Sequence, residues 1–230
     1  MSSIQPIKIY GKFGPNPPKI ACLVAELDIP HEIIPTGFDE VKQPAFLAIN
    51  PNGRMPAIYD PNTDITIWES GAIIEYLIER YDKDHRLSFA PGTHEYYHAK
   101  QWLFFQTTGQ APYFGQAYWF KQLHSEKIPS AIERYVKEIN RVTGVLDGWL
   151  ARQKTNGEDG PWLVGNKYSY ADLSFLSWYK TILYGKAFEG DLVASDYPHF
   201  EKWIKNMETR PKTEKIWIDI AAHYANKDKE

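Results

Sequence analysis

The sequence predicts a small mixed α/β domain followed by an all-helical domain. Short apolar runs alternate with helical patterns over the first 85 residues, whereas the rest of the chain shows only helical periodicity. Composition changes at the same place, because 10 of the 16 prolines lie before residue 86 and 26 of the 34 aromatic residues follow it. Such a shift across the polar stretch 82–93 is typical of a domain boundary. We therefore expect one domain over residues 1–85 and a second over residues 93–230.

Each element of the first domain follows from its own pattern. Residues 7–10 and 33–34 are predicted strands, and the apolar spacing of residues 19–27 between them predicts a helix, so the three form a βαβ unit. After a linking helix, residues 58–59 and 65–68 flank a turn sequence and predict an antiparallel hairpin. Apolar residues at helical spacing up to Tyr81 then predict a closing helix.

The second domain is predicted to hold about five helices. Prolines lie at or between the segments with helical spacing, where they are tolerated. These segments are 102–120, 132–149, 173–183, 200–207 and 216–224. Ser169-Tyr170-Ala171-Asp172 has the spacing of a capping box, with Asp in the usual Glu position, so we interpret it as the start of a helix.

Charge and composition exclude several classes of protein. The 26 basic and 29 acidic residues give a net charge of −3 without long runs of one sign, so we expect no nucleic-acid partner and no membrane partner. No apolar run approaches the roughly 18 residues of a membrane helix. The single cysteine, Cys22, cannot form an internal disulfide, and we expect it to be a buried core thiol in a reducing, cytoplasmic compartment.

One segment matches a zinc-hydrolase motif. His94-Glu95-Tyr96-Tyr97-His98 has the pattern H-E-x-x-H, in which two imidazoles one helical turn apart bind zinc and the Glu activates water. The alternative is an exposed first helical turn that follows Pro91-Gly92. No third ligand follows at a suitable spacing, although His124 could serve. We adopt the alternative and expect no metal.

The loop over residues 11–19 separates the first strand from the first helix. It contains no phosphate-binding pattern, and its prolines remove N–H groups that a phosphate would need. Asn16 lies at the helix N-terminus, where its side-chain amide can donate a hydrogen bond to an anion favoured by the positive helix end. The alternative role of Asn16 is an N-cap before Pro17.

Two further segments place polar groups at turns. Residues 50–58 lead into the hairpin, and a cis form of Pro56 would turn the backbone N–H and C=O of Met55 outward as an edge for an extended peptide. The alternative is a plain turn. Where the hairpin meets the closing helix, Ser70 can bind a carboxylate and Glu69 an ammonium group, as the two ends of an amino acid require. Ser70 could instead be an ordinary N-cap.

Taken in order, these three segments and the capping box resemble a cytosolic glutathione transferase over nearly the whole chain. Gly14-Pro15-Asn16 and residues 50–56 and 109–116 are similar, more narrowly, to the bacterial nu class and to the fungal class named after the yeast nitrogen-regulation prion protein. The resemblance implies the glutathione transferase fold: a thioredoxin-like N-terminal domain that binds glutathione, and an all-α C-terminal domain. It also implies a homodimer.

The resemblance assigns roles to particular residues. It implies that Pro56 is cis and that the backbone of Met55 pairs with the cysteinyl part of glutathione. Glu69 and Ser70 would hold the γ-glutamyl end, and Arg54 would lie at the same site.

The chemistry needs a thiolate near neutral pH, although a free thiol has a pKa of about 8.5. Many members of the family use a Tyr or Ser hydroxyl, and others use a Cys, but the loop over residues 11–19 has none of these. Asn16 is therefore the candidate donor to the sulfur, as in the narrower classes. Tyr10 is the second candidate, because its hydroxyl lies at the end of the first strand. The alternative is that Tyr10 is a strand residue that faces the core. Gly14 stands where nu-class members often have a Thr.

Dense aromatic residues predict where a second substrate binds. The aromatic residues after residue 112 are too closely spaced to lie on one buried helix face, so we expect some of them to contact a ligand. The alternative is that these rings pack at the dimer interface or the domain interface. The candidates are Tyr10, Tyr113, Phe114, Tyr118, Trp119 and Phe120.

We therefore expect a glutathione transferase in which glutathione is a co-substrate and its thiolate attacks a small electrophile, for detoxification or for a biosynthetic step. One alternative is a glutathione-dependent disulfide or peroxide reductase without an enzyme cysteine. Another is a glutathione-binding regulator without catalytic activity.

Overall fold

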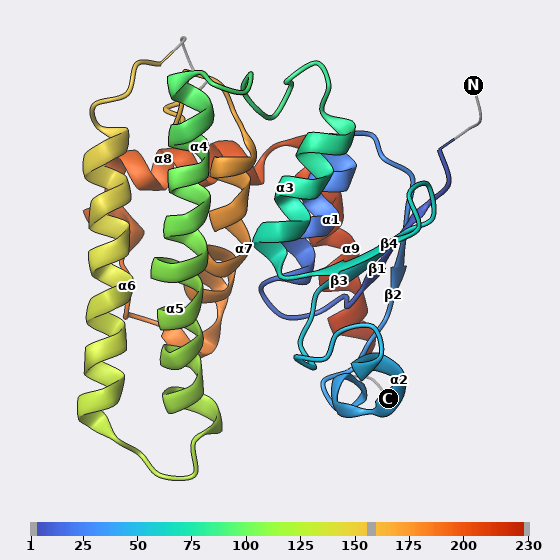
Figure 1. Ribbon diagram of the computed structural model, residues 1–230. Coiled ribbons are helices and arrows are strands. Elements are labelled where there is room, and N and C mark those ends of the chain that lie inside the picture. The colour runs from blue at the N-terminus through green and yellow to red at the C-terminus, as the bar shows by residue number, and fades with distance from the viewer. Residues whose placement is uncertain (1–3, 156–159, 228–230) are drawn as a thin grey trace. The chain divides into compact units, whose positions relative to one another are not determined.

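The computed structural model describes residues 4–155 and 160–227, and these form two compact units. The sheet unit comprises residues 4–87 and 209–227, and the helical unit comprises residues 88–155 and 160–208. The chain therefore passes from the first unit into the second and returns to the first. Figure 1 labels the helices and strands of both.

The sheet unit follows the predicted order of strands and helices, and a helix from the end of the chain completes it. The four-residue α2 is the linking helix expected before the hairpin. The elements of the unit are β1 (Ile7–Tyr10), α1 (Pro17–Glu26), β2 (His31–Ile34), η1 (Glu40–Lys42), α2 (Pro44–Leu47), β3 (Ala57–Asp60), β4 (Ile65–Trp68), α3 (Ser70–Tyr81) and α9 (Pro211–Lys227). The βαβ unit, the hairpin and the closing helix predicted from the sequence are confirmed.

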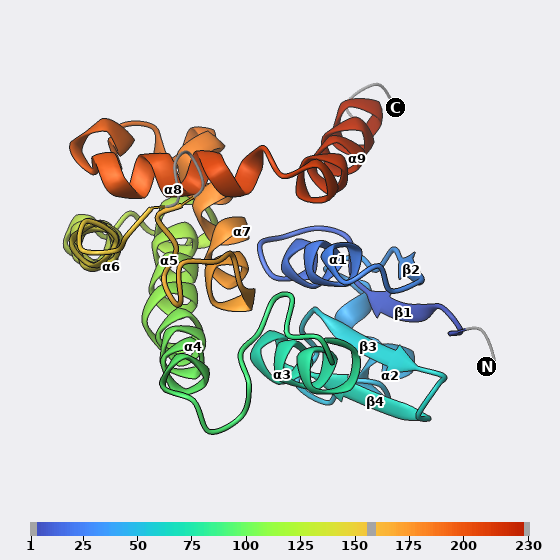
Figure 2. The same cartoon turned by 90° about the horizontal axis from the view of Figure 1, so that it is seen from above.

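The four strands form one mixed sheet in the order β2-β1-β3-β4. β1 is parallel to β2, where Ile9 pairs with Ile33, and antiparallel to β3, where Ile9 pairs with Ile58. Ile9 and Ile58 have no exposed surface, and burying such a side chain stabilises the fold by about 1.5–3 kcal/mol. α1 packs against both α3 and α9, as Figure 2 shows. α1 also contacts β1, and α3 contacts β4, the strand that precedes it.

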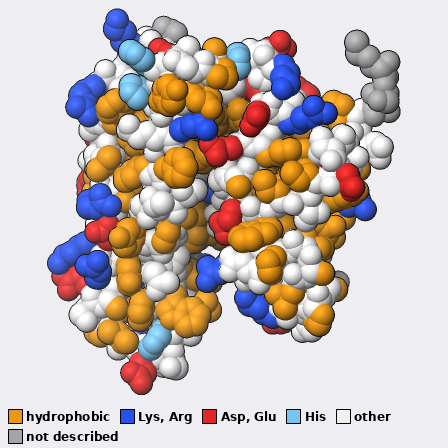
Figure 3. Space-filling model, in the orientation of Figure 1, with side chains coloured by type: hydrophobic (Ala, Val, Ile, Leu, Met, Phe, Trp, Pro, Cys, Tyr) orange, Lys and Arg blue, Asp and Glu red, His pale blue; other side chains and the backbone are white. Residues whose placement is uncertain are grey.

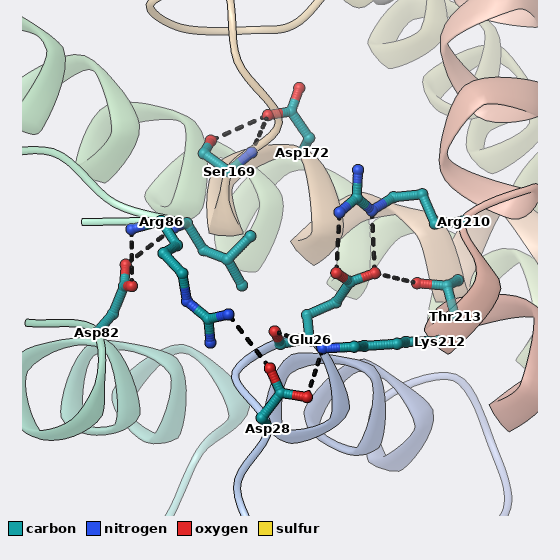
Figure 4. A network of polar contacts seen from close by, with 10 residues as sticks. Glu26, Asp28, Asp82, Arg86, Ser169, Asp172, Arg210, Lys212 and Thr213 are labelled. Carbon is teal, nitrogen blue, oxygen red and sulfur yellow. Dashed lines mark hydrogen bonds and ion pairs between the residues drawn. The ribbon is translucent and has the colours of Figure 1, made fainter. Parts of the chain in front are cut away.

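Polar contacts between α1 and the start of α9 are shown in Figure 4. Glu26 accepts hydrogen bonds from Nε and Nη2 of Arg210, each at 2.9 Å, and from the hydroxyl of Thr213 at 3.2 Å. Lys212 Nζ donates to Asp28 at 2.6 Å. These contacts and the packing on α1 place α9 in the sheet unit, whereas the sequence-based domain 93–230 included it. An amphipathic period predicts that a helix has an apolar face but does not say which partner covers that face.

The helical unit is built around aromatic side chains. The rings of Tyr179 and Phe200 lie 4.5 Å apart, and those of Phe114 and Tyr179 lie 5.3 Å apart. Two π-helical segments make residues 94–123 a continuous helical run, longer than the predicted 102–120. The elements are α4 (His94–Phe105), η2 (Gln106–Gln110), α5 (Ala111–Tyr118), η3 (Trp119–Leu123), α6 (Pro129–Leu150), α7 (Tyr170–Tyr184), η4 (Lys186–Phe188), η5 (Ala194–Asp196) and α8 (Pro198–Glu208).

The predicted capping box begins α7. Ser169 donates to Asp172 Oδ2 from its backbone N–H at 3.0 Å and from its hydroxyl at 2.9 Å. Asp172 Oδ1 also accepts from the backbone N–H of Leu163 at 2.8 Å and from Nε1 of Trp203 at 2.9 Å. One buried carboxylate therefore connects the start of α7, the preceding loop and α8.

The surface carries charges of both signs. On the face drawn in Figure 3, Lys and Arg side chains are interspersed with Asp and Glu, which agrees with the small net charge. In the part of the chain that the structure describes, no helix is both long enough and apolar enough to cross a membrane.

Candidate functional site

Asn16 occupies the N-cap position of α1, directly before two prolines. Pro is tolerated there because the first helical N–H groups have no partner within the helix. Within the described residues, however, the Asn16 side chain does not cap the helix, since its backbone is already in the helical region at φ −94° and ψ −41°. Its Oδ1 accepts a hydrogen bond from Lys19 Nζ at 3.2 Å. The N-cap alternative for the Asn16 side chain is therefore not what the structure contains.

Lys19 connects this loop to α3. Its side chain is buried, with 1% of the residue surface exposed, and Nζ donates to Asn16 Oδ1 at 3.2 Å and to Ser70 Oγ at 3.1 Å. Burial disfavours the charged amine and lowers the pKa of Lys19 to about 7, although the Glu69 carboxylate acts in the opposite direction. A single amino group therefore joins two of the predicted site residues.

The turn before β3 is shaped by Asn50, which is 2% exposed. Asn50 Nδ2 donates to the carbonyl of Arg54 at 2.6 Å, and Asn50 Oδ1 accepts from the backbone N–H of Asn52 at 2.9 Å. The Met55–Pro56 peptide bond is cis, as expected. The side chain of Arg54 is exposed on the same segment.

The end of β1 lies directly against Met55. Tyr10 pairs with Ala57 in the antiparallel ladder, so the next residue, Gly11, comes close to the segment that precedes Ala57. A Cβ on Gly11, whose φ is +108°, would lie 2.8 Å from the Met55 sulfur. Only glycine fits this approach, because any side chain would also be strained at that φ.

Glu69 and Ser70 form the junction between β4 and α3. Glu69 is exposed and has φ 71° and ψ 116°, a conformation that costs a non-glycine residue about 1–3 kcal/mol and that is concentrated at functional sites. Ser70 is the first residue of α3, is 8% exposed and accepts from Lys19. Asn52 Nδ2 lies 3.5 Å from Glu69 Oε1, which links this junction to the turn before β3.

The structure thus brings Asn16, Ser70 and Glu69 together at the N-termini of α1 and α3. Two residues of this cluster were missed from the sequence. Asn52 was not predicted because residues 50–58 were considered only for the backbone of Met55. Lys19 was not predicted because it lies in the first turn of α1 and was treated as an ordinary helix residue. The available signal was that Lys19 is three residues after Asn16, so the two side chains share one helix face.

The aromatic residues predicted for a second substrate differ in exposure. Phe114 has no exposed surface and packs edge-on against Trp178 and Tyr179, so it is a core residue of the helical unit and is withdrawn from the predicted set. The other rings of the cluster keep exposed surface: Tyr113, Tyr118, Trp119 and Phe120. Tyr10, in the sheet unit, is half-buried at the end of β1.

The zinc-motif residues His94, Glu95 and His98 lie exposed on the first turns of α4, which Thr93 caps by accepting from the Tyr96 N–H at 3.2 Å. In residues 4–155 and 160–227 no three His, Cys, Asp or Glu side chains are grouped so that they could hold a metal ion. Cys22 is buried within α1, as expected of a core thiol.

Comparisons with known proteins agree with this architecture. The N-terminal domain profile of glutathione S-transferases matches residues 5–79, and the C-terminal domain profile matches residues 107–211. The glutathione S-transferase-like protein tpcF of Aspergillus fumigatus is 57% identical over 221 residues, which are 96% of this chain and 98% of that protein.

Solved structures show the same fold. The glutathione transferase URE2P8 of Phanerochaete chrysosporium, solved with oxidised glutathione, has a TM-score of 0.88 and 37% identity and covers 98% of this chain and 99% of its own. Ure2p5 of the same fungus, cocrystallised with 1-(S-glutathionyl)-2,4-dinitrobenzene, has a TM-score of 0.84 and 35% identity and covers 97% and 98%. The predicted thioredoxin-like N-terminal domain and helical C-terminal domain are therefore confirmed. The chain belongs to the glutathione S-transferase family and to its Ure2p-like fungal class.

Proposed function

We propose that this protein is a glutathione transferase in which the Asn16 amide donates a hydrogen bond to the sulfur of glutathione. The observation that carries the proposal is the grouping of Asn16, Ser70 and Glu69 around the buried Lys19 amine. Two relatives support the ligand: URE2P8 was solved with oxidised glutathione and Ure2p5 with a glutathione conjugate of dinitrobenzene.

Each part of glutathione has a proposed partner. Ser70 and the N–H groups of the first turn of α3 take the γ-glutamyl carboxylate, because unpaired N–H groups and the helix dipole favour an anion there. Glu69 takes the γ-glutamyl ammonium, and Arg54 adds a positive charge at the same site. The backbone of Met55 pairs with the cysteinyl residue, as an added strand would.

The reaction then needs an ionised sulfur. A hydrogen bond from the Asn16 amide stabilises the thiolate more than the thiol and so lowers the thiol pKa from about 8.5. The thiol proton goes to water. The thiolate uses one electron pair to form the sulfur–carbon bond, and the leaving group of the electrophile departs with the pair from the bond that breaks. The rings of Tyr113, Tyr118, Trp119 and Phe120 are proposed to contact this electrophile.

A second candidate function is the reduction of small disulfides or peroxides by two molecules of glutathione. The first glutathione thiolate attacks one sulfur of the disulfide, breaks the S–S bond and releases one substrate thiolate, which leaves a mixed disulfide. The second thiolate attacks the glutathione sulfur of this mixed disulfide and releases oxidised glutathione and the other substrate thiolate. With a peroxide, the first thiolate attacks an oxygen and breaks the O–O bond to give a glutathione sulfenic acid and an alcohol or water, and the second thiol condenses with the sulfenic acid to give oxidised glutathione and water. Structures of relatives that hold oxidised glutathione favour it. Because Cys22 is buried, the protein itself would supply no thiol for this reaction. We propose, from the family resemblance, a cytoplasmic homodimer in either case.

The Asn16→Ala variant tests both functions, assayed with a halogenated dinitrobenzene and with a small disulfide. Loss of one hydrogen bond to a charged sulfur should lower kcat/KM by about 10- to 100-fold. Asn16→Asp should be at least as slow, because a carboxylate cannot donate and repels a thiolate. Tyr10→Phe is the matched control for the second candidate hydroxyl and should keep nearly full activity.

Three results would overturn parts of this proposal. Unchanged rates in Asn16→Ala with both substrates would remove Asn16 from the chemistry. A large loss in Tyr10→Phe would assign the sulfur contact to the tyrosine. Tight glutathione binding by calorimetry, with no turnover of any electrophile or disulfide, would favour the non-catalytic regulator.

A further inference from the structure

Lys19 is unusual because a lysine is almost never fully buried unless other groups hold its amine. It is 1% exposed and follows two buried prolines in α1. Moving an amine out of water is costly, so it persists only where hydrogen bonds compensate. Its amine donates to Asn16 Oδ1 and to Ser70 Oγ, and both acceptors belong to the proposed glutathione site.

We infer that Lys19 is a positioning residue of the transferase site, and that its hydrogen bond to Asn16 Oδ1 determines which end of the Asn16 amide faces the glutathione sulfur. The inference rests on the proposed function and adds a residue that acts through Asn16. Lys19 need not touch glutathione for this role.

The two ends of the Asn16 amide have opposite hydrogen-bonding roles. Asn offers an oxygen that only accepts and an NH2 group that only donates. Lys19 has donors to offer, so its contact at 3.2 Å fixes the oxygen on its own side and turns the NH2 group the other way. Without Lys19 the amide could rotate and present its oxygen to the sulfur. That oxygen would repel a thiolate instead of stabilising it.

The same amine orders Ser70. A hydroxyl has one donor and two acceptor positions, and Lys19 occupies an acceptor position of Ser70 at 3.1 Å. The proton of Ser70 is therefore directed away from Lys19, toward another acceptor such as a carboxylate. The Glu69 carboxylate favours the protonated form of the Lys19 amine. Lys19 thus sets the direction of two donors at once.

The Lys19→Met variant removes the donor and leaves a side chain suited to an apolar interior. Lys19→Gln has a similar length and keeps an NH2 donor. Lys12→Met, in the same loop but half-exposed, is the matched control. For each variant we would follow the ultraviolet absorbance of bound thiolate against pH, together with kcat and KM for glutathione.

We expect Lys19→Met to raise the apparent pKa of the bound thiol and to lower kcat by about 10-fold, as the loss of one hydrogen bond implies. Lys19→Gln should recover part of both effects, and Lys12→Met should resemble the wild type. A purely structural role would leave the thiol titration where it is. Unchanged titration in a folded Lys19→Met protein overturns the inference.

A double-mutant cycle with Asn16→Ala separates the two claims. If Lys19 acts through Asn16, Lys19→Met should have little further effect in the Asn16→Ala background. Equal losses in both backgrounds would overturn the positioning role while leaving the proposed function intact. No effect of Asn16→Ala alone would overturn the proposed function instead.

Should Lys19→Met fail to fold, a structure of the wild-type protein with glutathione provides the test. The inference expects Lys19 Nζ to remain in hydrogen-bond distance of the Asn16 oxygen while the sulfur lies on the opposite side of the amide. A Lys19 amine that has left Asn16, or that itself contacts the sulfur, would contradict it.

Discussion

At the scale of single residues, the lowered pKa of the Lys19 amine affects the stability of the protein. Its side chain is surrounded by protein between the start of α1 and the start of α3. Desolvation opposes its charge, whereas Glu69 favours it, and the net result is a pKa lowered from 10.5 to about 7. The protein therefore contains an amine that titrates near neutral pH beside the proposed thiolate.

This shift predicts how stability changes with pH. Between about pH 7 and 10.5 the unfolded chain keeps a proton on Lys19 that the folded chain has released, so raising the pH in this window favours the folded state. Relative to Lys19→Met, the wild type should therefore gain free energy of unfolding as pH rises through the window and should show a constant difference below it. Urea unfolding of both proteins at several pH values measures this. A difference that stays constant throughout would contradict the lowered pKa.

The sequence could predict Asn16, Glu69 and Ser70 because each follows a turn or a strand end, where polar groups are exposed by the backbone. It could not predict that Lys19 is buried, since a lysine in a first helical turn is usually solvated. Nor could the sequence predict that Phe114 is buried while the other rings of residues 113–120 keep exposed surface. The ring density of residues 113–120 was evident, but the helix rotation that buries one ring and exposes the others depends on packing against α7.

At the scale of elements, Glu26, the last residue of α1, connects that helix to α9. Its side chain is 6% exposed, and its carboxylate accepts two parallel hydrogen bonds from Arg210 and one from Thr213. Bidentate pairs of this kind are among the stronger polar contacts, and removing one partner leaves the other without its counter-charge.

Glu26→Ala should lower the free energy of unfolding of the sheet unit by about 2 kcal/mol, since the pair is largely but not fully buried. The matched control is Asp28→Ala, which removes exposed contacts to Arg86 and Lys212 and should change stability little. Hydrogen exchange of the α1 amides in both variants provides the measurement. Equal protection in the two variants would show that the Glu26 contact does not hold α9.

The capping box is the second test at this scale. Burial raises the pKa of Asp172 to about 6, although its hydrogen bonds from Leu163, Trp203 and Ser169 oppose the shift. Asp172→Ala leaves these donors without an acceptor and should cost about 3 kcal/mol, whereas Ser169→Ala should cost about 1 kcal/mol. Denaturant unfolding followed by tryptophan fluorescence compares the two. Similar losses would mean that Asp172 acts only as a local cap.

At the scale of the whole molecule, the chain completes its first unit with its last helix. The predicted boundary at 82–93 is where the sequence changes composition, and the chain leaves the sheet unit between Leu87 and Ser88. The return of α9 to that unit could not be predicted, because local periodicity carries no information on distant partners. The order of strands and helices over residues 4–85, by contrast, followed from short-range patterns.

A chain that ends at Glu208 tests this division. It lacks α9 and so exposes the surface of α1 that α9 covers, where Thr213, Ile216 and Ile220 are buried. We expect the sheet unit to lose stability and glutathione affinity to fall by at least about 10-fold, a difference of 1.4 kcal/mol. The helical circular dichroism of the other unit should remain. Calorimetry that finds unchanged affinity would show that α9 is dispensable for the site.

The account depends most on the contact between the Asn16 amide and the sulfur of glutathione. A crystal structure of the wild-type protein with reduced glutathione measures this contact directly. The account predicts the sulfur in hydrogen-bond distance of Asn16 Nδ2, with the γ-glutamyl end at Glu69 and Ser70. A sulfur whose nearest polar neighbour is the Tyr10 hydroxyl, or any group other than Asn16, would contradict it.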